Sequence, residues 1–415
     1  MQRMLSTELS AHVGQAVTIA GWVHRRRLLK SVAFLIVRDA AGLSQIVVTD
    51  PDVRAQLEEL PEETVVTVTG TVKEHATGVE ITEPDVRALS GAAAVPLPFE
   101  VHRPALSAGM ATQLDHAALA LRHPSRALAL RVSAAATAGF RTALDRQRFV
   151  EIHTPKIVGT ATESGANVFT LDYFGRPAYL AQSPQLYKQL MVGVFERVYE
   201  TGPVFRAEPH DTARHLAQYT SLDAELGFIT DHRDVMAVLT TVVAEMTATV
   251  AERTGIEVPE VPAEIPSVHF ADALRIAGAP PDEPDLAPAH ERALGEWAQR
   301  EHGSEFVFVT GYPMAKRPFY THPQPTDPRW SNSFDLLFRG LELVTGGQRL
   351  HRHADYLAVA PDPEKIAGYL DGLRYGMPPH GGFAIGLERF TARLTGAANV
   401  REATAFPRDL HRVFP

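Results

Sequence analysis

Apolar and polar residues alternate in short stretches over roughly the first ninety residues of the chain. Alternation with a period of two is typical of β-strands that bury one face. In residues 64–73, for example, valine alternates with threonine. The pattern predicts strands at 17–23, 32–38, 43–48, 64–73 and 79–89, with a short helix at 50–60.

Three strands, a short helix and two further strands follow one another in the five-stranded OB-fold β-barrel, which binds oligonucleotides on one face. Another small barrel with the same succession of elements is the alternative. Residues 24–30 hold three arginines and a lysine, and we expect them in a basic loop between the first two strands. Phe34 and Gln45 on the next two strands are suited to stack on a base and to hydrogen-bond to a base edge. The alternative is a core position for Phe34 and a basic loop that faces only solvent.

The rest of the chain predicts a larger domain of mixed helices and strands. Helical spacing of apolar residues indicates a helix at 125–149, and further helices are expected near 184–195 and 231–253. Residues 257–290 are rich in proline and are expected to form a surface excursion. The expected organisation is a barrel at 1–90, a hinge at 91–125 and the larger domain at 126–415.

Composition narrows the classes of function. The formal net charge is -9, from 40 Lys and Arg against 49 Asp and Glu, so RNA binding has to come from local basic patches. The chain has no cysteine, which excludes disulfides, thiolate zinc sites and cysteine nucleophiles. We see no signal peptide and no apolar run approaching the roughly 20 residues of a membrane span, so a cytoplasmic protein is expected.

Two short motifs in the larger domain carry candidate chemistry. Phe205-Arg206-Ala207-Glu208 places an arginine and a glutamate on one side of a strand, where they can hold an α-phosphate and the adenine edge. Near the C-terminus, Gly386 precedes Leu-Glu-Arg, so the backbone can approach a nucleotide while Arg389 supplies a planar cation. The chain lacks both the P-loop and the dinucleotide-binding glycine signatures, which excludes those two kinds of nucleotide site.

In this order and separation, the two motifs resemble the second and third signature motifs of class II aminoacyl-tRNA synthetases. Residues 149–155 resemble the first, which implies that Pro155 lies at a homodimer interface. The resemblance is closest to the archaeal-type, short aspartyl enzymes and covers nearly the whole chain. Further matching stretches are 21–23, 34–39, 181–189, 346–349 and 375–382. The resemblance implies an α+β catalytic domain, built on a mixed, mainly antiparallel sheet flanked by helices, together with an OB-fold anticodon-binding domain.

The resemblance also implies an enzyme that makes aspartyl-adenylate from L-aspartate and ATP and passes the acyl group to tRNA. Arg206 and Arg389 are then the catalytic residues. The implied ATP-binding residues are Arg206, Glu208, Arg214, His215, Leu216, Glu342, Gly386, Glu388 and Arg389. The implied aspartate-binding residues are Glu163, Gln185, Lys188, Arg206, Thr345 and Arg349. Mg²⁺ is implied at Glu342 and Thr345, whose hard oxygen atoms suit that ion.

The residues at a few positions indicate which amino acid and which tRNAs the enzyme uses. Lys188 and Arg349 supply positive charge for a β-carboxylate, and asparaginyl enzymes generally lack that lysine. Relatives restricted to tRNA-Asp tend to carry tryptophan where this chain has His24, and lysine near position 85, beside Pro84. We therefore expect both tRNA-Asp and tRNA-Asn as substrates. The implied anticodon-binding residues are His24, Arg27, Phe34, Gln45 and Pro84.

Three other functions remain as alternatives. One is an asparaginyl-tRNA synthetase, which Lys188 disfavours. Another is a paralogue that activates aspartate for a non-tRNA acceptor, which should have lost the barrel or its basic segment. The third is a non-catalytic RNA-binding protein, in which Arg206, Glu208, Glu342 or Arg389 should have been replaced.

Overall fold

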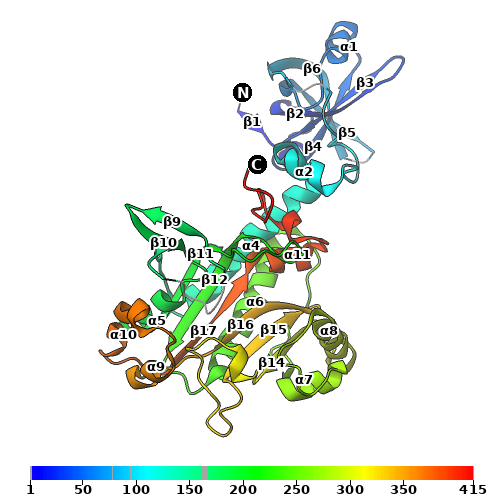
Figure 1. Ribbon diagram of the computed structural model, residues 1–415. Coiled ribbons are helices and arrows are strands. Elements are labelled where there is room, and N and C mark those ends of the chain that lie inside the picture. The colour runs from blue at the N-terminus through cyan, green and yellow to red at the C-terminus, as the bar shows by residue number, and fades with distance from the viewer. Residues whose placement is uncertain (1, 77, 94–95, 161–166, 415) are drawn as a thin grey trace. The chain divides into compact units, whose positions relative to one another are not determined.

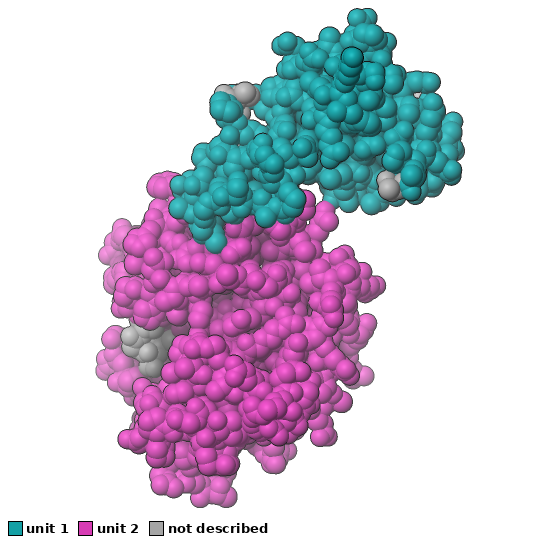
Figure 2. Space-filling model, turned by 90° about the vertical axis from the view of Figure 1, so that its right-hand side faces the viewer, with its two compact units in different colours: residues 1–123 teal, residues 124–415 magenta. Residues whose placement is uncertain are grey.

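The computed structural model describes residues 2–76, 78–93, 96–160 and 167–414. It consists of two compact units, residues 1–123 and 124–415, which Figure 2 colours separately. The segment expected as a hinge contains two short helices, α2 (Met110–Asp115) and α3 (Ala117–Ala120), which belong to the first unit.

The first unit is built on a closed five-stranded barrel, which confirms the expected fold. Its strands are β2 (Ala16–Leu28), β3 (Ala33–Arg38), β4 (Leu43–Val48), β5 (Val65–His75) and β6 (Gly78–Ser90). They pair in the order β2-β3-β4-β6-β5, and β5 pairs back to β2. Helix α1 (Pro51–Glu58) begins after Asp50, whose carboxylate accepts hydrogen bonds from two backbone amides of the first turn. The sequence did not indicate β1 (Arg3–Met4) or the 3-10 helix η1 (Ser6–His12).

The basic segment lies on a strand, so its expected placement in a loop was wrong. Strand β2 continues to Leu28, and an irregularity in the β2–β3 pairing follows Val23. Arg26 donates from Nη1 to the carbonyl oxygens of Leu57 and Glu58, where α1 ends. One of the three consecutive arginines therefore caps a helix, whereas Arg27 is exposed and pairs with Phe34 on β3.

The second unit contains an eight-stranded sheet in the order β13-β14-β15-β16-β17-β12-β11-β7. Figure 1 labels its six central strands, from β14 to β11. Its strands are β7 (Val150–Glu151), β11 (Arg197–Phe205), β12 (Gln218–Gly227), β13 (Ser267–His269), β14 (Phe306–Thr310), β15 (Ser333–Phe338), β16 (Leu341–Gln348) and β17 (His380–Gly386). Only the outermost pairs, β13–β14 and β7–β11, are parallel. A smaller sheet joins β8 (Ile157–Val158), β10 (Arg176–Leu180) and β9 (Thr170–Tyr173). The expected mixed, mainly antiparallel sheet is confirmed.

Helices α4 (Pro124–Arg146), α6 (His232–Thr254) and α11 (Leu387–Thr395) share one core with this sheet. By length and composition, α6 is apolar enough to cross a membrane, which the sequence analysis did not anticipate. Several of its apolar residues, including Leu239, Val243 and Met246, are fully buried in that core, and Met236 and Val238 are partly buried against it. The apolarity of α6 therefore reflects the packing of a core helix.

Further helices flank the sheet. They are α5 (Gln185–Phe195), α7 (Phe270–Ala277), α8 (Pro288–His302), α9 (His353–Val359) and α10 (Ala367–Leu373), with the 3-10 turns η2 (Met314–Lys316), η3 (Pro363–Ile366) and η4 (Val400–Ala403). The expected surface excursion at 257–290 was wrong in its central part, because β13 and α7 lie there. Phe270 and Leu274 of α7 are buried in a second core with α8 and β14.

Candidate active site

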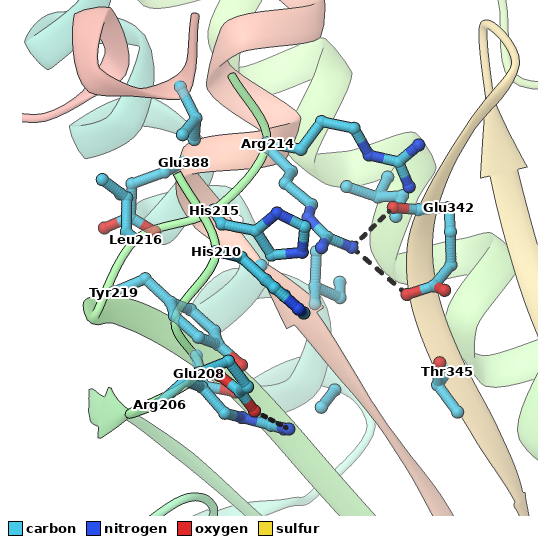
Figure 3. A pocket seen from close by; sticks show the side chains of 17 residues that line it. Arg206, Glu208, His210, Arg214, His215, Leu216, Tyr219, Glu342, Thr345 and Glu388 are labelled. Carbon is cyan, nitrogen blue, oxygen red and sulfur yellow. Dashed lines mark hydrogen bonds and ion pairs between the residues drawn. The ribbon is translucent and has the colours of Figure 1, made fainter. Parts of the chain in front are cut away.

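A cavity of about 320 Å³ lies over the antiparallel part of the sheet, as Figure 3 shows. It is lined by Arg206, Glu208, His210, Arg214, His215, Leu216, Tyr219, Ser221, Glu342, Leu343, Thr345, Ala384, Ile385, Gly386, Glu388, Arg389 and Val400. Every residue that the family resemblance implied for ATP binding is among them, although these residues come from three separate segments. The loop between β11 and β12, residues 206–217, supplies one wall, and β16, β17 and α11 supply others.

Arg206 and Glu208 come from the first residues after β11. The backbone amide of Arg206 donates to the carbonyl oxygen of Ala217, which closes the base of the 206–217 loop. Nη1 of Arg206 lies 3.9 Å from Oε1 of Glu208, and Figure 3 shows the two side chains beside each other. Both side chains are partly exposed, so a cation and a carboxylate are available at the cavity surface.

Arg389 and Glu342 face this pair from the other side of the cavity. Nη1 of Arg389 donates to the side chain and to the backbone carbonyl oxygen of Glu342, at 3.2 and 3.1 Å. A bulge in the β15–β16 pairing adds Leu343 between the paired residues Glu342 and Val344. Because a bulge shifts the alternation by one residue, Glu342 and Thr345 both reach the cavity from the same strand.

These two oxygen-bearing side chains fit a partly hydrated Mg²⁺, which takes one or two carboxylates together with waters and substrate phosphates. Within the described residues there is no cluster of three or more His, Asp or Glu side chains that would form an all-protein metal cage. The donor set therefore suits an ion that arrives with the nucleotide.

Two lining groups have pKa values set mainly by burial. Burial, followed by the nearby Arg389 cation, lowers the pKa of His215, so its imidazole is neutral near neutral pH. Burial raises the pKa of Glu388 to about 6. The carboxylate of Glu388 accepts hydrogen bonds from the amide of Thr220, so it ties α11 to β12 as well as lining the cavity. Arg214 is held by Glu291 of α8 at 3.1 Å.

A buried ionic cluster lies next to the cavity. Nζ of Lys188 is 2.9 Å from Asp223 and 3.3 Å from Glu225, and Nε of Arg349 is 3.0 Å from Glu225. Although burial alone would raise it, the pKa of Glu225 is held below its ordinary value by the charges of Arg349 and Lys188. The sequence analysis expected Lys188 and Arg349 to supply positive charge for the β-carboxylate of the substrate, and in the structure both contact the carboxylate of Glu225.

The cluster is connected to the cavity through β12. Ser221 lines the cavity and donates from its hydroxyl to Asp223. Ser221, Asp223 and Glu225 are alternate residues, so they share one face of the strand. Every second residue of this buried strand is polar. That alternation was the signal in the sequence that Asp223 and Glu225 share a functional face, although the sequence analysis had left both without a role.

Of two other residues expected to bind aspartate, Gln185 and Glu163, the structure describes only Gln185. Gln185 is buried at the start of α5, and its Nε2 atom has no hydrogen-bond partner among the described residues. Glu163 lies outside the described residues.

The barrel carries its own cavity, of about 360 Å³. Its lining is His24, Arg25, Arg27, Ile36, Leu43, Gln45, His75, Gly78, Val79 and His102. It therefore brings together three of the five residues expected to bind the anticodon, and it adds His75 and His102, which the sequence analysis missed. Phe34 is half-buried and pairs with Arg27. Pro84 is buried beside Gly70 and does not line this cavity.

His24 is an uncharged member of that lining. Its Nδ1 atom lies 3.2 Å from Nη1 of Arg38, which in turn pairs with Glu63. Burial, followed by the Arg38 cation, lowers the pKa of His24 to about 4. The imidazole is therefore neutral near neutral pH and contributes shape and hydrogen bonding to the cavity.

A nucleic-acid-type barrel, and an antiparallel sheet that gathers Arg206, Glu208 and Arg389 around one cavity, define a class II aminoacyl-tRNA synthetase. Residues 109–410 match the family of class II tRNA synthetases (D, K and N), and residues 17–89 match the OB-fold nucleic acid binding domain. The chain belongs to this family of synthetases, whose members bind ATP, an amino acid and tRNA.

Relatives that match this chain over its full length show which synthetases of the family it resembles. The chain is 46% identical to an aspartate–tRNA(Asp/Asn) ligase of Thermus thermophilus, with 100% of both chains covered. It is 45% identical to an enzyme of the same name from Deinococcus radiodurans, covering 100% of this chain and 99% of that one. Among solved structures, it superposes on asparaginyl-tRNA synthetase from Pyrococcus horikoshii with asparaginyl-adenylate, at a TM-score of 0.92, 29% identity and full coverage of both chains.

Proposed function

We propose that this chain is an aspartate–tRNA ligase that charges both tRNA-Asp and tRNA-Asn. It uses ATP to convert L-aspartate to aspartyl-adenylate and then transfers the aspartyl group to the end of the tRNA. The observation that carries the choice of aspartate is the buried cluster in which Lys188 and Arg349 meet beside the nucleotide cavity. The working state is a cytoplasmic homodimer with Pro155 at its interface.

In the first step, an α-carboxylate oxygen of aspartate attacks the α-phosphorus of ATP, and the bond to pyrophosphate breaks. Anionic groups approach each other, so the protein must orient them and stabilise the growing charge. Arg206 is placed to hold the α-phosphate against the attacking carboxylate, and Arg389 to hold the outer phosphates on the opposite wall. In the second step, a terminal ribose hydroxyl of tRNA attacks the acyl carbon and AMP leaves.

Glu342 and Thr345 would hold the Mg²⁺ that accompanies ATP and neutralises part of its phosphate charge. Glu342 also accepts from Arg389, so the same carboxylate orients the cation that faces the phosphates. Glu208 is placed to accept from the adenine amino group, while Arg214 and His215 face the outer phosphates.

The β-carboxylate of aspartate would bind to Arg349. The hydrogen bonds of Arg349 to Glu225 and to the carbonyl oxygen of Gly382 use Nε and Nη2. Among the described residues, Nη1 of Arg349 has no acceptor, so this nitrogen of the guanidinium group can donate to an oxygen of the substrate. An asparagine amide would place a hydrogen donor or a neutral oxygen there and leave the buried cation poorly matched.

The barrel supports the use of both tRNAs. His24 is neutral and stands where relatives restricted to tRNA-Asp tend to carry a large indole, so no indole restricts the third anticodon base, while Arg25 and Arg27 supply the cations of the same cavity. The relatives at 46% and 45% identity bear names that include both tRNAs.

The direct test is aminoacylation of tRNA-Asp and tRNA-Asn transcripts by the purified chain. We expect kcat/KM for the two to differ by less than about a hundredfold, which corresponds to about 2.7 kcal/mol. Each transcript carrying the anticodon of the other is the matched control, because only the third anticodon base then changes. A preference for tRNA-Asp above that ratio would restrict the proposal to one tRNA, and charging of neither would overturn it.

A further inference from the structure

The loop that supplies much of the ATP cavity has no regular secondary structure of its own. Residues 206–217 form turns and bends, yet they carry Glu208, His210, Arg214 and His215 into the cavity. A loop of this kind needs contacts from elsewhere to keep its side chains in place. The C-terminal segment, which we define as residues 399–412, supplies them.

The backbones of the two segments are joined at two points. The amide of Val400 donates to the carbonyl oxygen of Ala213, at 2.8 Å, and the amide of Ala217 donates to the carbonyl oxygen of Arg408, at 2.7 Å. Val400 also lines the cavity. The C-terminal segment therefore contacts the loop near its middle and at its end, and it forms part of the cavity wall.

Arg401 connects the two points. Its guanidinium donates from Nη2 to the carboxylate of Asp211, at 2.7 Å, and from Nη1 to the carbonyl oxygen of Thr212, at 3.1 Å. From Nε it donates to Asp409 of its own segment. The side chains of Arg401 and Asp409 are both 8% exposed, so the bond between them is shielded from water, whereas Asp211 is half-exposed.

Asp409 gives Arg401 a fixed anchor. Its Oδ1 atom accepts from the backbone amides of His411 and Arg412, at 2.9 and 2.8 Å, which leaves Oδ2 for Arg401. The planar guanidinium of Arg401 thus joins the ordered carboxylate of Asp409 on one side to the loop on the other. A lysine cannot reproduce this geometry.

We propose that Arg401 is a positioning residue for ATP: through Asp211 and Thr212 it holds the 206–217 loop in the conformation that binds the nucleotide. Arg401 does not line the cavity, so it acts through the loop. This inference rests on the proposed function in one respect, which is that aspartate is the amino acid used in the exchange assay. The effect of Arg401 on ATP binding can be measured without any reaction.

The test compares the intact chain with R401A, R401K and D211A. We expect R401A to raise KM for ATP in aspartate-dependent ATP–pyrophosphate exchange by about tenfold. KM for aspartate should change less than about twofold, and R401K should recover only part of the loss because it cannot bond to Asp211, Thr212 and Asp409 together. Asp211 is half-exposed, so D211A should keep the fold and raise KM for ATP by about threefold.

Two measurements separate this proposal from a failure to fold and from a wrong function. Calorimetric titration with a non-hydrolysable ATP analogue should show the same loss of affinity, even if aspartate proves not to be the substrate. Arg374→Ala, which removes an exposed arginine paired with Asp371, is the matched control and should leave ATP affinity unchanged. Unchanged ATP affinity in a folded R401A overturns the proposal. If R401A does not fold, unchanged ATP affinity in D211A overturns it.

Discussion

Replacing Lys188 by methionine is expected to lower kcat/KM for aspartate in ATP–pyrophosphate exchange by at least about a thousandfold, or about 4 kcal/mol. The side chain of Lys188 is 2% exposed, and its ammonium group contacts two carboxylates of the chain itself. Without it, Asp223 and Glu225 outnumber Arg349, so the cluster becomes negative and repels the β-carboxylate of the substrate. Leaving buried carboxylates without their partner should also cost about 3–5 kcal/mol of folding stability.

Activity and stability can be separated in this cluster. Lys365→Met, at an exposed lysine paired with Asp362, is the matched control and should change neither. The double variant K188M/D223N restores the charge balance, so it should recover much of the unfolding temperature while aspartate-dependent exchange stays low. Lys188 would lose its assigned role if folded K188M kept exchange within about tenfold of the unchanged chain.

The second large effect is expected at Arg206. R206A should lower kcat of the exchange reaction by roughly a thousandfold, because the charge developing at the α-phosphate is largest in the transition state. R206K should recover little, since an ammonium group cannot hold two oxygens in one plane. R206A should change stability less than K188M does, because the ion pair of Arg206 with Glu208 spans 3.9 Å and is partly exposed.

Steady-state exchange kinetics combined with thermal unfolding check this expectation. A variant that raised KM for ATP and kept kcat would mean that Arg206 binds ATP and the transition state equally. That result would remove Arg206 from catalysis and leave it as a binding residue.

The sequence predicted the barrel well because each strand buries one face, and that requirement appears directly as alternation. It also indicated residues that meet at one cavity, since Arg206 and Arg389 stand in short motifs with recognisable spacing. The same reasoning failed for α7, where proline-rich flanks concealed a short helix whose apolar residues pack against α8. Local composition does not reveal which distant helix will cover such a segment.

Residues whose roles depend on distant partners were the ones missed. Arg26 is one of three adjacent arginines, and nothing local distinguishes the one that caps α1. Pro84 was placed at the anticodon by resemblance; a pairing irregularity between β5 and β6 places it beside Gly70 and outside the lining of the barrel cavity. Arg401 contacts Asp211, 190 residues earlier in the chain, and no pattern along the sequence indicates that contact.

In this account, the choice of aspartate over asparagine depends on the buried cations of Lys188 and Arg349. That choice needs a direct test, because the structure is highly similar to that of an asparaginyl-tRNA synthetase. The most direct measurement is ATP–pyrophosphate exchange without tRNA, with each amino acid in turn. The expected result is a kcat/KM for aspartate at least about a thousandfold above that for asparagine. Exchange supported equally well, or better, by asparagine would contradict the assignment.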